Sequence, residues 1–216
     1  MPHEKLIDKT VHFVKNTLSD AEGGHDWWHT YRVWKMARHI AEAEGVVNIV
    51  IDLGALLHDI ADAKFHGGDE SKGPVVADNF LMSLGIDAEI REHVIQIIRN
   101  ISFKNASEQH FRSPELDIIQ DADRLDAMGA IGIARAFNYG GFKNRPMYDP
   151  LVKPDLHMSK EKYKKGLSPT LNHFHEKLLL LKEMMNTPAG KALAKERHEY
   201  MIAFVSRFLE EWEGKM

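Results

Sequence analysis

The sequence predicts an all-α protein. Along most of the chain, apolar residues recur every three or four positions, which is the spacing of one helix face, and the alternation typical of strands is almost absent. Capping residues, glycines and prolines occur where these periodic stretches begin and end. Apolar residues form 44% and charged residues 28% of the composition, which is ordinary for a globular protein and excludes a collagen-like or wholly disordered chain.

The first 136 residues carry six predicted helices, each marked by a capping residue or a breaker. The apolar face of the first helix runs from Leu6 to Leu18. The expected boundaries that follow are Asp26 and Gly45 for the second helix, Asn48 for the start of the third, Gly73-Pro74 and Gly85 for the fourth, Asp87 for the fifth and Ser113-Pro114 for the sixth.

The helical pattern fails from Tyr139 to Leu167, where glycines and prolines interrupt a polar stretch. An irregular segment of this length is typical of a functional loop or lid, or of disorder. Two further helices are expected, each introduced by a capping residue and a proline, at Ser168-Pro169 and Thr187-Pro188. We therefore expect one domain over residues 1–216, with a helical core over about 20–136, a long irregular loop over about 139–167 and a C-terminal helical extension over about 168–213.

Charge and cysteine content exclude several classes of protein. The net charge is −4 and the pI is near 6.3, which argues against nucleic-acid binding by the molecule as a whole. A local basic run, Lys160 to Lys165, is interrupted by Glu161 and is expected to be a solvated helix start. The absence of cysteine excludes disulfides, thiolate-bound zinc, iron–sulfur clusters and thiol nucleophiles. Without a signal-peptide pattern or an apolar stretch of about 20 residues, we expect a cytoplasmic protein with no membrane partner.

Three short segments concentrate side chains that bind metal ions. His29 shares a helix face with Val33 and is expected to point inward. His58 and Asp59 follow two leucines in an apolar helix, and Asp123 lies in another helix with a buried face. Several buried carboxylates in one small core would repel each other, and a divalent cation would compensate them. With no cysteine, such a site must use nitrogen and oxygen ligands.

Taken singly, these and neighbouring residues have structural interpretations. A lone inward histidine is more often a hydrogen-bonded core residue than a ligand. The remaining candidates are expected to be structural, with Asp121 and Asp126 as caps or surface charges. Packing is favoured for Trp27 and Trp28, with stacking on a base as the alternative, and it is the default for His173 and His175, of which only one can share the core face.

A histidine, a His-Asp pair and a distant aspartate, all on helices, resemble the HD-domain metal-dependent phosphohydrolases over about 26–136. The resemblance implies that the metal ligands are His29, His58, Asp59 and Asp123, because Ala122-Asp123-Arg124-Leu125 matches the family's last ligand segment. Segments 145–150 and 172–178 are similar to a bacterial HD subgroup whose members look like nucleotide pyrophosphohydrolases.

Two imidazoles and two carboxylates suit Mn²⁺, Fe²⁺, Co²⁺, Ni²⁺ or Zn²⁺, with Mg²⁺ a weaker fit. We expect one ion per chain, preferably manganese, because His66, His93 and His110 do not form a clear second ligand set. A bound ion would activate water and polarise a phosphoryl oxygen.

Phosphoryl transfer also needs cations for the developing charge on the phosphoryl oxygens. Arg32 and Lys64 lie nearest to the ligands in sequence, and Asp62, four residues after His58, could position water or an imidazole. The expected catalytic residues are Asp59, Asp62, Arg32 and Lys64. The expected substrate-binding residues are Arg32, Lys64, Lys143, Arg145 and Tyr148, although a solvated loop remains the alternative for the last three.

The leading hypothesis is a metal-dependent phosphohydrolase that acts by a metal-activated water on a small phosphorylated molecule, with a nucleotide favoured. Either a phosphate ester or a pyrophosphate bond could be cleaved. The alternative is a non-catalytic nucleotide-sensing or protein-interaction domain that keeps the HD scaffold. A third option, oxidative chemistry at a di-iron site, would require a second metal. The exact substrate, the general acid and the oligomeric state stay open, and a homodimer is allowed.

Overall fold

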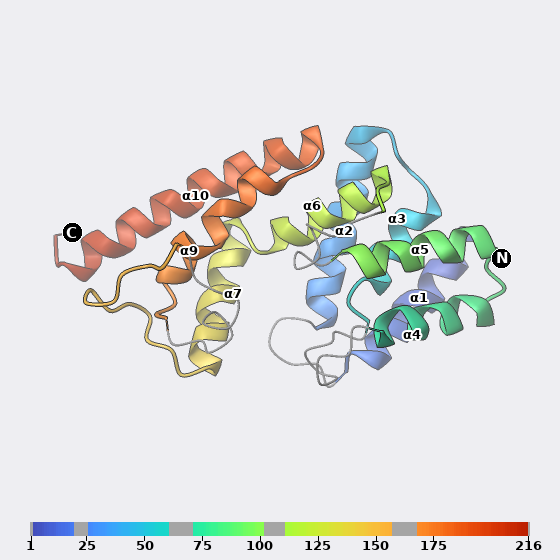
Figure 1. Ribbon diagram of the computed structural model, residues 1–216, viewed down its shortest axis with the longest axis horizontal. Helices are drawn as coiled ribbons and strands as arrows, with labels where there is room; N and C mark the ends of the chain where they lie inside the picture. Colours follow the sequence, from blue (N-terminus) through green and yellow to red (C-terminus); the bar gives the residue numbers. More distant parts are fainter. Residues whose placement is uncertain (1, 20–25, 61–70, 102–110, 157–167, 216) are drawn as a thin grey trace. The chain divides into compact units, whose positions relative to one another are not determined.

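The computed structural model describes residues 2–19, 26–60, 71–101, 111–156 and 168–215 (Figure 1). The regular elements within these ranges are all helices, which confirms the predicted all-α class. The chain forms two compact units, unit 1 over Met1–Ala122 and unit 2 over Asp123–Met216. The boundary falls inside helix α6 (Pro114–Asp126), and the expectation of one domain stays a prediction.

Unit 1 is organised around α3 (Ile49–Leu57), whose residues from Val50 to Leu57 are all buried. This helix packs against α1, α2 and α5, so it has almost no solvent-facing side. At Gly54 a Cβ would lie only 2.7 Å from Cδ1 of Ile119, which shows how closely α6 approaches α3. The surrounding helices are α1 (His3–Thr17), α2 (Trp27–Glu44), α4 (Lys72–Ser83) and α5 (Ala88–Asn100).

Capping hydrogen bonds confirm four of the five predicted helix starts in unit 1, whereas α4, expected from Gly73-Pro74, begins at Lys72 without a side-chain cap. Oδ1 of Asp26 accepts from the backbone N–H of His29 at 2.9 Å, and Asn48 and Asp87 cap α3 and α5 in the same way. Oγ of Ser113 accepts from the N–H of Leu116 at 3.1 Å at the start of α6. Each bond satisfies an amide that would otherwise lack a partner in the first turn.

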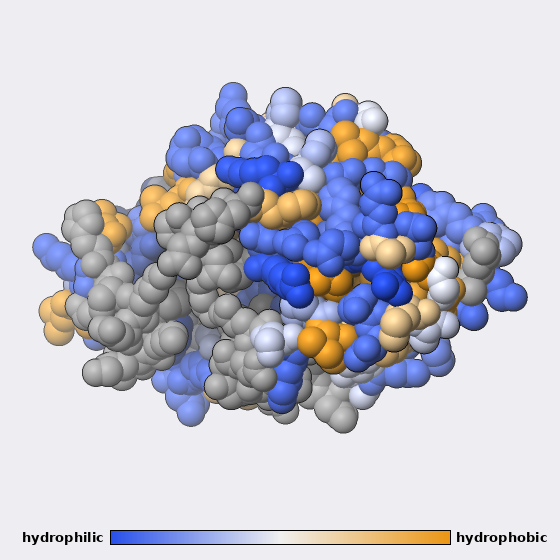
Figure 2. All heavy atoms as spheres, turned by 45° about the vertical axis from the view of Figure 1, so that its right-hand side comes forward, coloured by the Kyte–Doolittle hydropathy of each residue, from blue (hydrophilic) through white to orange (hydrophobic). Residues whose placement is uncertain are grey.

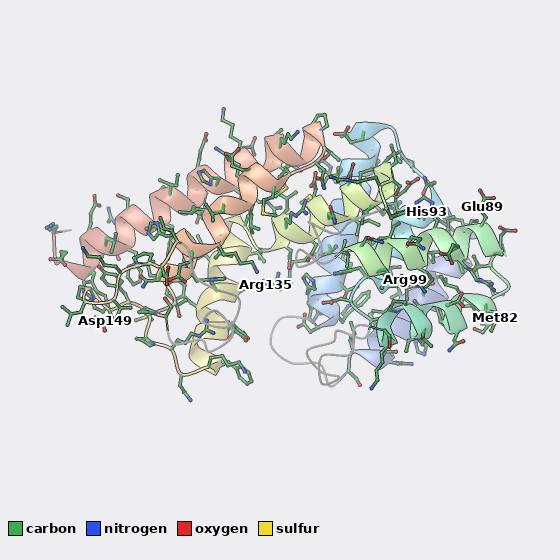
Figure 3. The ribbon with its side chains drawn as sticks, in the orientation of Figure 1. Met82, Glu89, His93, Arg99, Arg135 and Asp149 are labelled. Carbon is green, nitrogen blue, oxygen red and sulfur yellow. The ribbon has the colours of Figure 1, made fainter. Side chains whose placement is uncertain are left out.

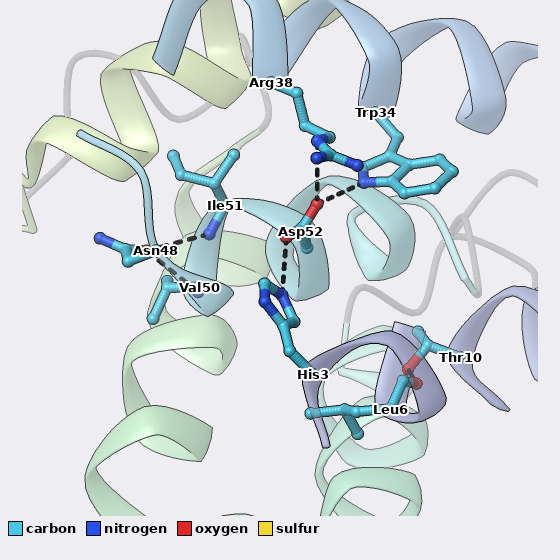
Figure 4. A network of polar contacts seen from close by, with 9 residues as sticks. All are labelled: His3, Leu6, Thr10, Trp34, Arg38, Asn48, Val50, Ile51 and Asp52. Carbon is cyan, nitrogen blue, oxygen red and sulfur yellow. Dashed lines mark hydrogen bonds and ion pairs between the residues drawn. The ribbon is translucent and has the colours of Figure 1, made fainter. Parts of the chain in front are cut away.

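A polar network joins three of these helices at a single buried carboxylate (Figure 4). Trp34 Nε1 donates to Oδ1 of Asp52 at 2.6 Å, and Arg38 Nε lies 3.8 Å from the same oxygen. His3 Nε2 lies 3.1 Å from Oδ2. The network therefore anchors the beginning of α1 and the middle of α2 to α3.

Unit 2 is built on α7 (Gly129–Phe142), α9 (Asn172–Glu176), the 3₁₀ helix η3 (Leu178–Met184) and α10 (Pro188–Trp212). Its core contains four phenylalanines. Phe137 lies 5.9 Å, centroid to centroid, from each of Phe174, Phe204 and Phe208, so aromatic rings from α7, α9 and α10 form one cluster. Contacts of this kind add to the burial of apolar area.

The structure corrects three predicted boundaries in the second half of the chain. Helix α7 continues to Phe142, so the helical pattern persists beyond Tyr139. The helix expected from Ser168 begins only at Asn172, because Oγ of Ser168 donates to Oε1 of Glu176 at 2.9 Å instead of capping a first turn. It also ends at Glu176, because the next residue, Lys177, has a φ of −146°, and η3 follows.

Other expectations for this half of the chain are confirmed. Thr187 Oγ1 accepts from the N–H of Gly190 at 2.9 Å, as the cap-plus-proline pair predicts for α10. The described stretch 143–156 contains no regular helix. Among the helices of the described ranges, none combines the length and apolar character that crossing a membrane requires. On the face shown in Figure 2, hydrophilic residues predominate over the coloured surface and apolar residues occur in small separate groups.

Candidate metal centre

His29 reaches the interior of unit 1 because of how α2 begins. Asp26 caps the helix through the amide of His29 itself, which places this residue in the first turn. Val33 follows on the same face, one turn later, and is fully buried. Only 2% of His29 is exposed, so the predicted inward orientation is confirmed.

His58 and Asp59 lie immediately after α3, which ends at Leu57. The sequence predicts that the pair lies within the helix, and this is wrong, because the helix ends at Leu57 and the backbone turns there. The series of buried apolar residues nevertheless continues to Ile60 in that turn. Nδ1 of His58 lies 2.8 Å from the carbonyl oxygen of Ala55, to which it donates as Nδ1–H. Because Nδ1 carries the proton, Nε2 has the lone pair that can bind a metal ion or accept a hydrogen bond.

The three side chains converge on one point. Nε2 of His58 lies 3.3 Å from Nε2 of His29, and Nε2 of His29 lies 3.9 Å from Oδ2 of Asp59. One ligand atom from each residue lies within 4.8 Å of both others. His58 is 6% exposed and the side chain of Asp59 is 16% exposed, so the group is largely removed from solvent.

These separations fit a shared cation. With metal–nitrogen distances of about 2.1 Å, two neighbouring ligands of a tetrahedral or octahedral ion lie about 3.0–3.4 Å apart. The two ring nitrogens, 3.3 Å apart, fall in that range. Two neutral imidazoles whose lone pairs face each other repel, so a proton or a metal ion between them is required. A nitrogen and carboxylate donor set without sulfur suits a borderline divalent ion.

The structure brings together three of the four predicted ligands. Asp123 is half-buried on α6 and is the first residue of unit 2, so its place in the ligand set stays a prediction. Arg32 lies on α2, three residues after His29, and is half-buried. Asp62 and Lys64 lie outside the described residues.

The predicted substrate residues of unit 2 have identifiable neighbours. Nζ of Lys143 lies 4.8 Å from the ring centroid of Phe142, and Cζ of Arg145 lies 5.5 Å from that of Tyr139. The ring of Tyr148 packs edge-on against Trp212 of α10 at 5.2 Å. Their role in binding substrate stays a prediction.

Two aspartates expected to be caps or surface charges have buried side chains. Asp121 is fully buried and Asp126 is 4% exposed. Asp126 accepts a hydrogen bond from Arg135, which compensates its charge. Arg135 lies on α7, as labelled in Figure 3. Arg197 of α10 donates to the carbonyl oxygen of Leu125; burial lowers the pKa of its guanidinium, and Asp126 opposes that shift. The spacing of these residues in the sequence does not predict the two contacts, because each contact joins α6 to a later helix.

The prediction that Trp28 packs in the core is also wrong. This residue is 61% exposed, because it precedes the inward His29 by one position and one residue rotates a helix face by about 100°. Trp27 is half-buried beneath Lys15, whose Nζ lies 4.8 Å from its ring centroid.

His93, on α5 (Figure 3), has a structural set of partners. Its Nε2 lies 3.0 Å from Oγ of Ser113 and 3.4 Å from Oε2 of Glu115. Asn48 donates to the other carboxylate oxygen of Glu115 at 2.8 Å. Burial raises the pKa of the Glu115 carboxyl, but the backbone hydrogen bond, Asn48 and His93 together lower it below its ordinary value. This cluster ties α5 and the start of α3 to the start of α6.

Two buried imidazoles beside a carboxylate, at the ends of helices in an all-α unit, form the arrangement of an HD domain. The model of the HD domain family matches residues 27–128, in agreement with the resemblance seen in the sequence. The chain belongs to this family, as its similarity to whole bacterial proteins also shows.

Three comparisons with particular proteins cover nearly the whole chain. YpgQ of Bacillus subtilis is 36% identical over an alignment of 216 positions, which covers 99% of this chain and 97% of that protein. The crystal structure of an HD-superfamily hydrolase from Bacillus thuringiensis is 43% identical, with a TM-score of 0.79 over 98% of this chain and 99% of the other. The crystal structure of Bacillus subtilis YpgQ in complex with ADP gives 34% identity and a TM-score of 0.75 over 98% and 96% of the two chains.

Proposed function

We propose that this protein is a metal-dependent phosphohydrolase that acts on a small phosphorylated substrate, and that this substrate is a nucleotide. The observation that carries the proposal is the convergence of His29, His58 and Asp59 at distances that suit one divalent ion. The similarity to an HD-superfamily hydrolase supports the reaction class. The complex of YpgQ with ADP supports the choice of a nucleotide.

Each residue of the centre has a distinct task in this proposal. The first turn of α2 places His29 on the inward face, and the bond to the carbonyl of Ala55 orients the ring of His58. The Nε2 atoms of the two rings face each other at 3.3 Å. Asp59 supplies negative charge, and Asp123 is the proposed fourth ligand. A divalent ion held there, preferably manganese, would lower the pKa of a water ligand and polarise a phosphoryl oxygen.

Cationic side chains complete the proposed mechanism. Arg32, half-buried on α2, would stabilise the negative charge that develops on the phosphoryl oxygens in the transition state. Lys64 is proposed for the same task, and Asp62 is proposed to hold water or to orient an imidazole. Lys143, Arg145 and Tyr148 are proposed to contact the substrate.

The test is release of phosphate or pyrophosphate from a panel of nucleoside mono-, di- and triphosphates in the presence of Mn²⁺, Mg²⁺ or Co²⁺. Replacing His58 or Asp59 by Ala should abolish metal-dependent turnover, because each change removes one ligand atom from the group. His39→Ala is the matched control, since it removes an exposed imidazole from α2 and should keep wild-type turnover. Chromatography of the products identifies the bond that is broken.

Two results would contradict the proposal. Turnover that is unchanged in His58→Ala and Asp59→Ala would show that the reaction does not use this centre. Tight nucleotide binding by the metal-loaded protein without product would favour a nucleotide-sensing domain that keeps the HD scaffold.

A further inference from the structure

Four aromatic side chains form a strip along α2, within unit 1 and beginning next to the candidate metal centre. Trp27 and Trp28 open the helix, Tyr31 follows one turn later, and Trp34 comes after another three residues. The ring centroid of Tyr31 lies 5.8 Å from that of Trp27, 6.0 Å from that of Trp28 and 6.2 Å from that of Trp34. The rings are therefore in contact from the start of α2 to its middle.

Two of the tryptophans have partners that explain them by the stability of unit 1. Nζ of Lys15, on α1, lies 4.8 Å from the ring centroid of Trp27. Trp34 donates its indole N–H to the buried Asp52, and Cζ of Arg38 lies 5.8 Å from its ring centroid (Figure 4). Both tryptophans are half-buried. Each of them therefore helps to join α2 to a neighbouring helix.

Trp28 differs from both. It is 61% exposed, and within the described part of the chain its ring contacts that of Tyr31 alone, edge-on with an interplanar angle of 81°. Tyr31 is itself 36% exposed. A large apolar ring that stays in solvent contributes little to folding, so packing does not explain Trp28. Neighbouring exposed aromatic rings are instead typical of a surface that binds a ligand.

Trp28 lies on the side of α2 that is open to solvent next to His29. Because successive helical residues are turned by about 100°, Trp28 and Thr30 flank His29 on opposite sides of the helix. Thr30 is 1% exposed, and Val33 and Ala37, on the same flank, are fully buried. That flank is filled by the protein itself. A molecule that reaches His29 along α2 from solvent therefore passes Trp28.

We propose that Trp28, with Tyr31 beside it, is the stacking platform for the base of a nucleotide whose phosphoryl groups lie at the metal centre. The inference rests on the proposed function for the position of the phosphoryl groups. An exposed indole is a strong stacking partner for a base, and it accepts any base because every base has a π face. Lys35, exposed two turns after Trp28 on the same side of α2, adds positive charge that suits an anionic ligand. The subsite should therefore distinguish nucleotides from phosphates that lack a base.

The experiment compares two ligands that differ only in the nucleoside. The full chain is titrated calorimetrically with adenosine 5′-(α,β-methylene)diphosphate and with methylenediphosphonate, at the same free concentration of Mn²⁺. The methylene bridge replaces the oxygen of the pyrophosphate bond and prevents its hydrolysis. Trp28→Ala should weaken binding of the nucleotide analogue at least about tenfold, because the base loses its stacking partner. Binding of methylenediphosphonate should change less than about twofold, as expected for a surface substitution away from the phosphoryl groups.

Two further variants separate stacking from other effects. Trp28→Phe keeps an aromatic ring and should restore most of the affinity for the nucleotide analogue. Tyr200→Ala is the matched control, because it removes an aromatic ring that is 57% exposed from α10 of unit 2. Its affinity for either ligand should change less than about twofold.

The indole N–H signal of Trp28 in ¹H–¹⁵N NMR spectra, assigned by its loss in Trp28→Phe, gives a second readout. This signal should move when the nucleotide analogue binds and stay in place when methylenediphosphonate binds. Three results would each overturn the proposal: equal affinity of the wild type and Trp28→Ala for the analogue, equal weakening of both ligands, or an unmoved Trp28 signal. Failure of the proposed function would appear separately, as absent turnover of hydrolysable nucleotides by a protein that still binds the analogue through Trp28.

Discussion

The pKa of His173 makes a quantitative prediction about stability. Its imidazole has an ordinary pKa of 6.5, and burial followed by the charges of Lys177 and Arg145 lowers this pKa to about 4 in the folded protein. The unfolded chain therefore takes up a proton at a higher pH than the folded chain does. Above pH 6.5 both states are neutral at this site and the folded protein bears no penalty. As the pH falls from 6.5 towards 4, the unfolded state is favoured increasingly.

The size of this effect follows from the shift. A difference of 2.5 pKa units corresponds to about 3.4 kcal/mol when both states are protonated, at 1.36 kcal/mol per unit. At pH 5 the unfolded state is almost fully protonated and the folded state is mostly neutral, which gives about 2 kcal/mol. His173→Asn removes the titrating group. The variant should therefore lose about 2 kcal/mol less free energy of unfolding than the wild type when the pH is lowered from 8 to 5.

The assay is urea-induced unfolding at pH 8 and pH 5 in buffers that contain no phosphate. Every other titrating group is common to the two proteins, so the difference between their pH dependences isolates His173. A general loss of stability in the variant would affect both pH values and would not mimic the result. If the wild type and His173→Asn lose the same free energy on acidification, the imidazole is not held neutral and the reasoning is wrong.

Three further predictions concern unit 1. Saturating Mn²⁺ should raise the thermal unfolding midpoint of the wild type but not that of His58→Ala, because an ion that binds only the folded state stabilises it. Differential scanning calorimetry measures both midpoints, and an equal rise in the two proteins would place the ion elsewhere. Asp52→Ala should reduce the free energy of unfolding in urea by about 1–3 kcal/mol, because it leaves the indole N–H of Trp34 without its acceptor. A variant as stable as the wild type would contradict this role of Asp52. Gly54→Ala should cost about 1–3 kcal/mol in the same assay, because its Cβ would lie 2.7 Å from the terminal methyl of Ile119, and this side chain is fully buried with little room to move. A gain in stability from helix propensity would show that Ile119 moves aside freely.

Local signals in the sequence predicted most of the helical framework. Caps such as Asp26 and Thr187 act within three residues of their own position, so their effect can be recognised without knowing the fold. The inward orientation of His29 follows equally from its helical spacing to Val33. These features depend on one helix at a time, which is why sequence periodicity suffices.

The features that were missed depend on tertiary contacts. Apolar periodicity continues through Ile60, so it does not reveal that α3 ends at Leu57. The burial of Asp126 is compensated by Arg135, nine residues later and on another helix. His173 was assigned to packing because its neighbours in sequence are apolar, while the charge that shapes its environment includes Arg145 from a distant segment.

The end of α3 explains why a metal centre would form where the sequence places a costly carboxylate. The last carbonyls of a helix carry partial negative charge, which disfavours a nearby carboxylate and favours a cation. Asp59 lies two residues after this end, and His58 uses the carbonyl of Ala55 to orient its ring. Without a proton or a cation between the two rings, the carboxylate, the helix end and two facing imidazole lone pairs would oppose each other. A divalent ion would reverse the sign of all three interactions, so the most unfavourable point of unit 1 would become favourable on metal binding.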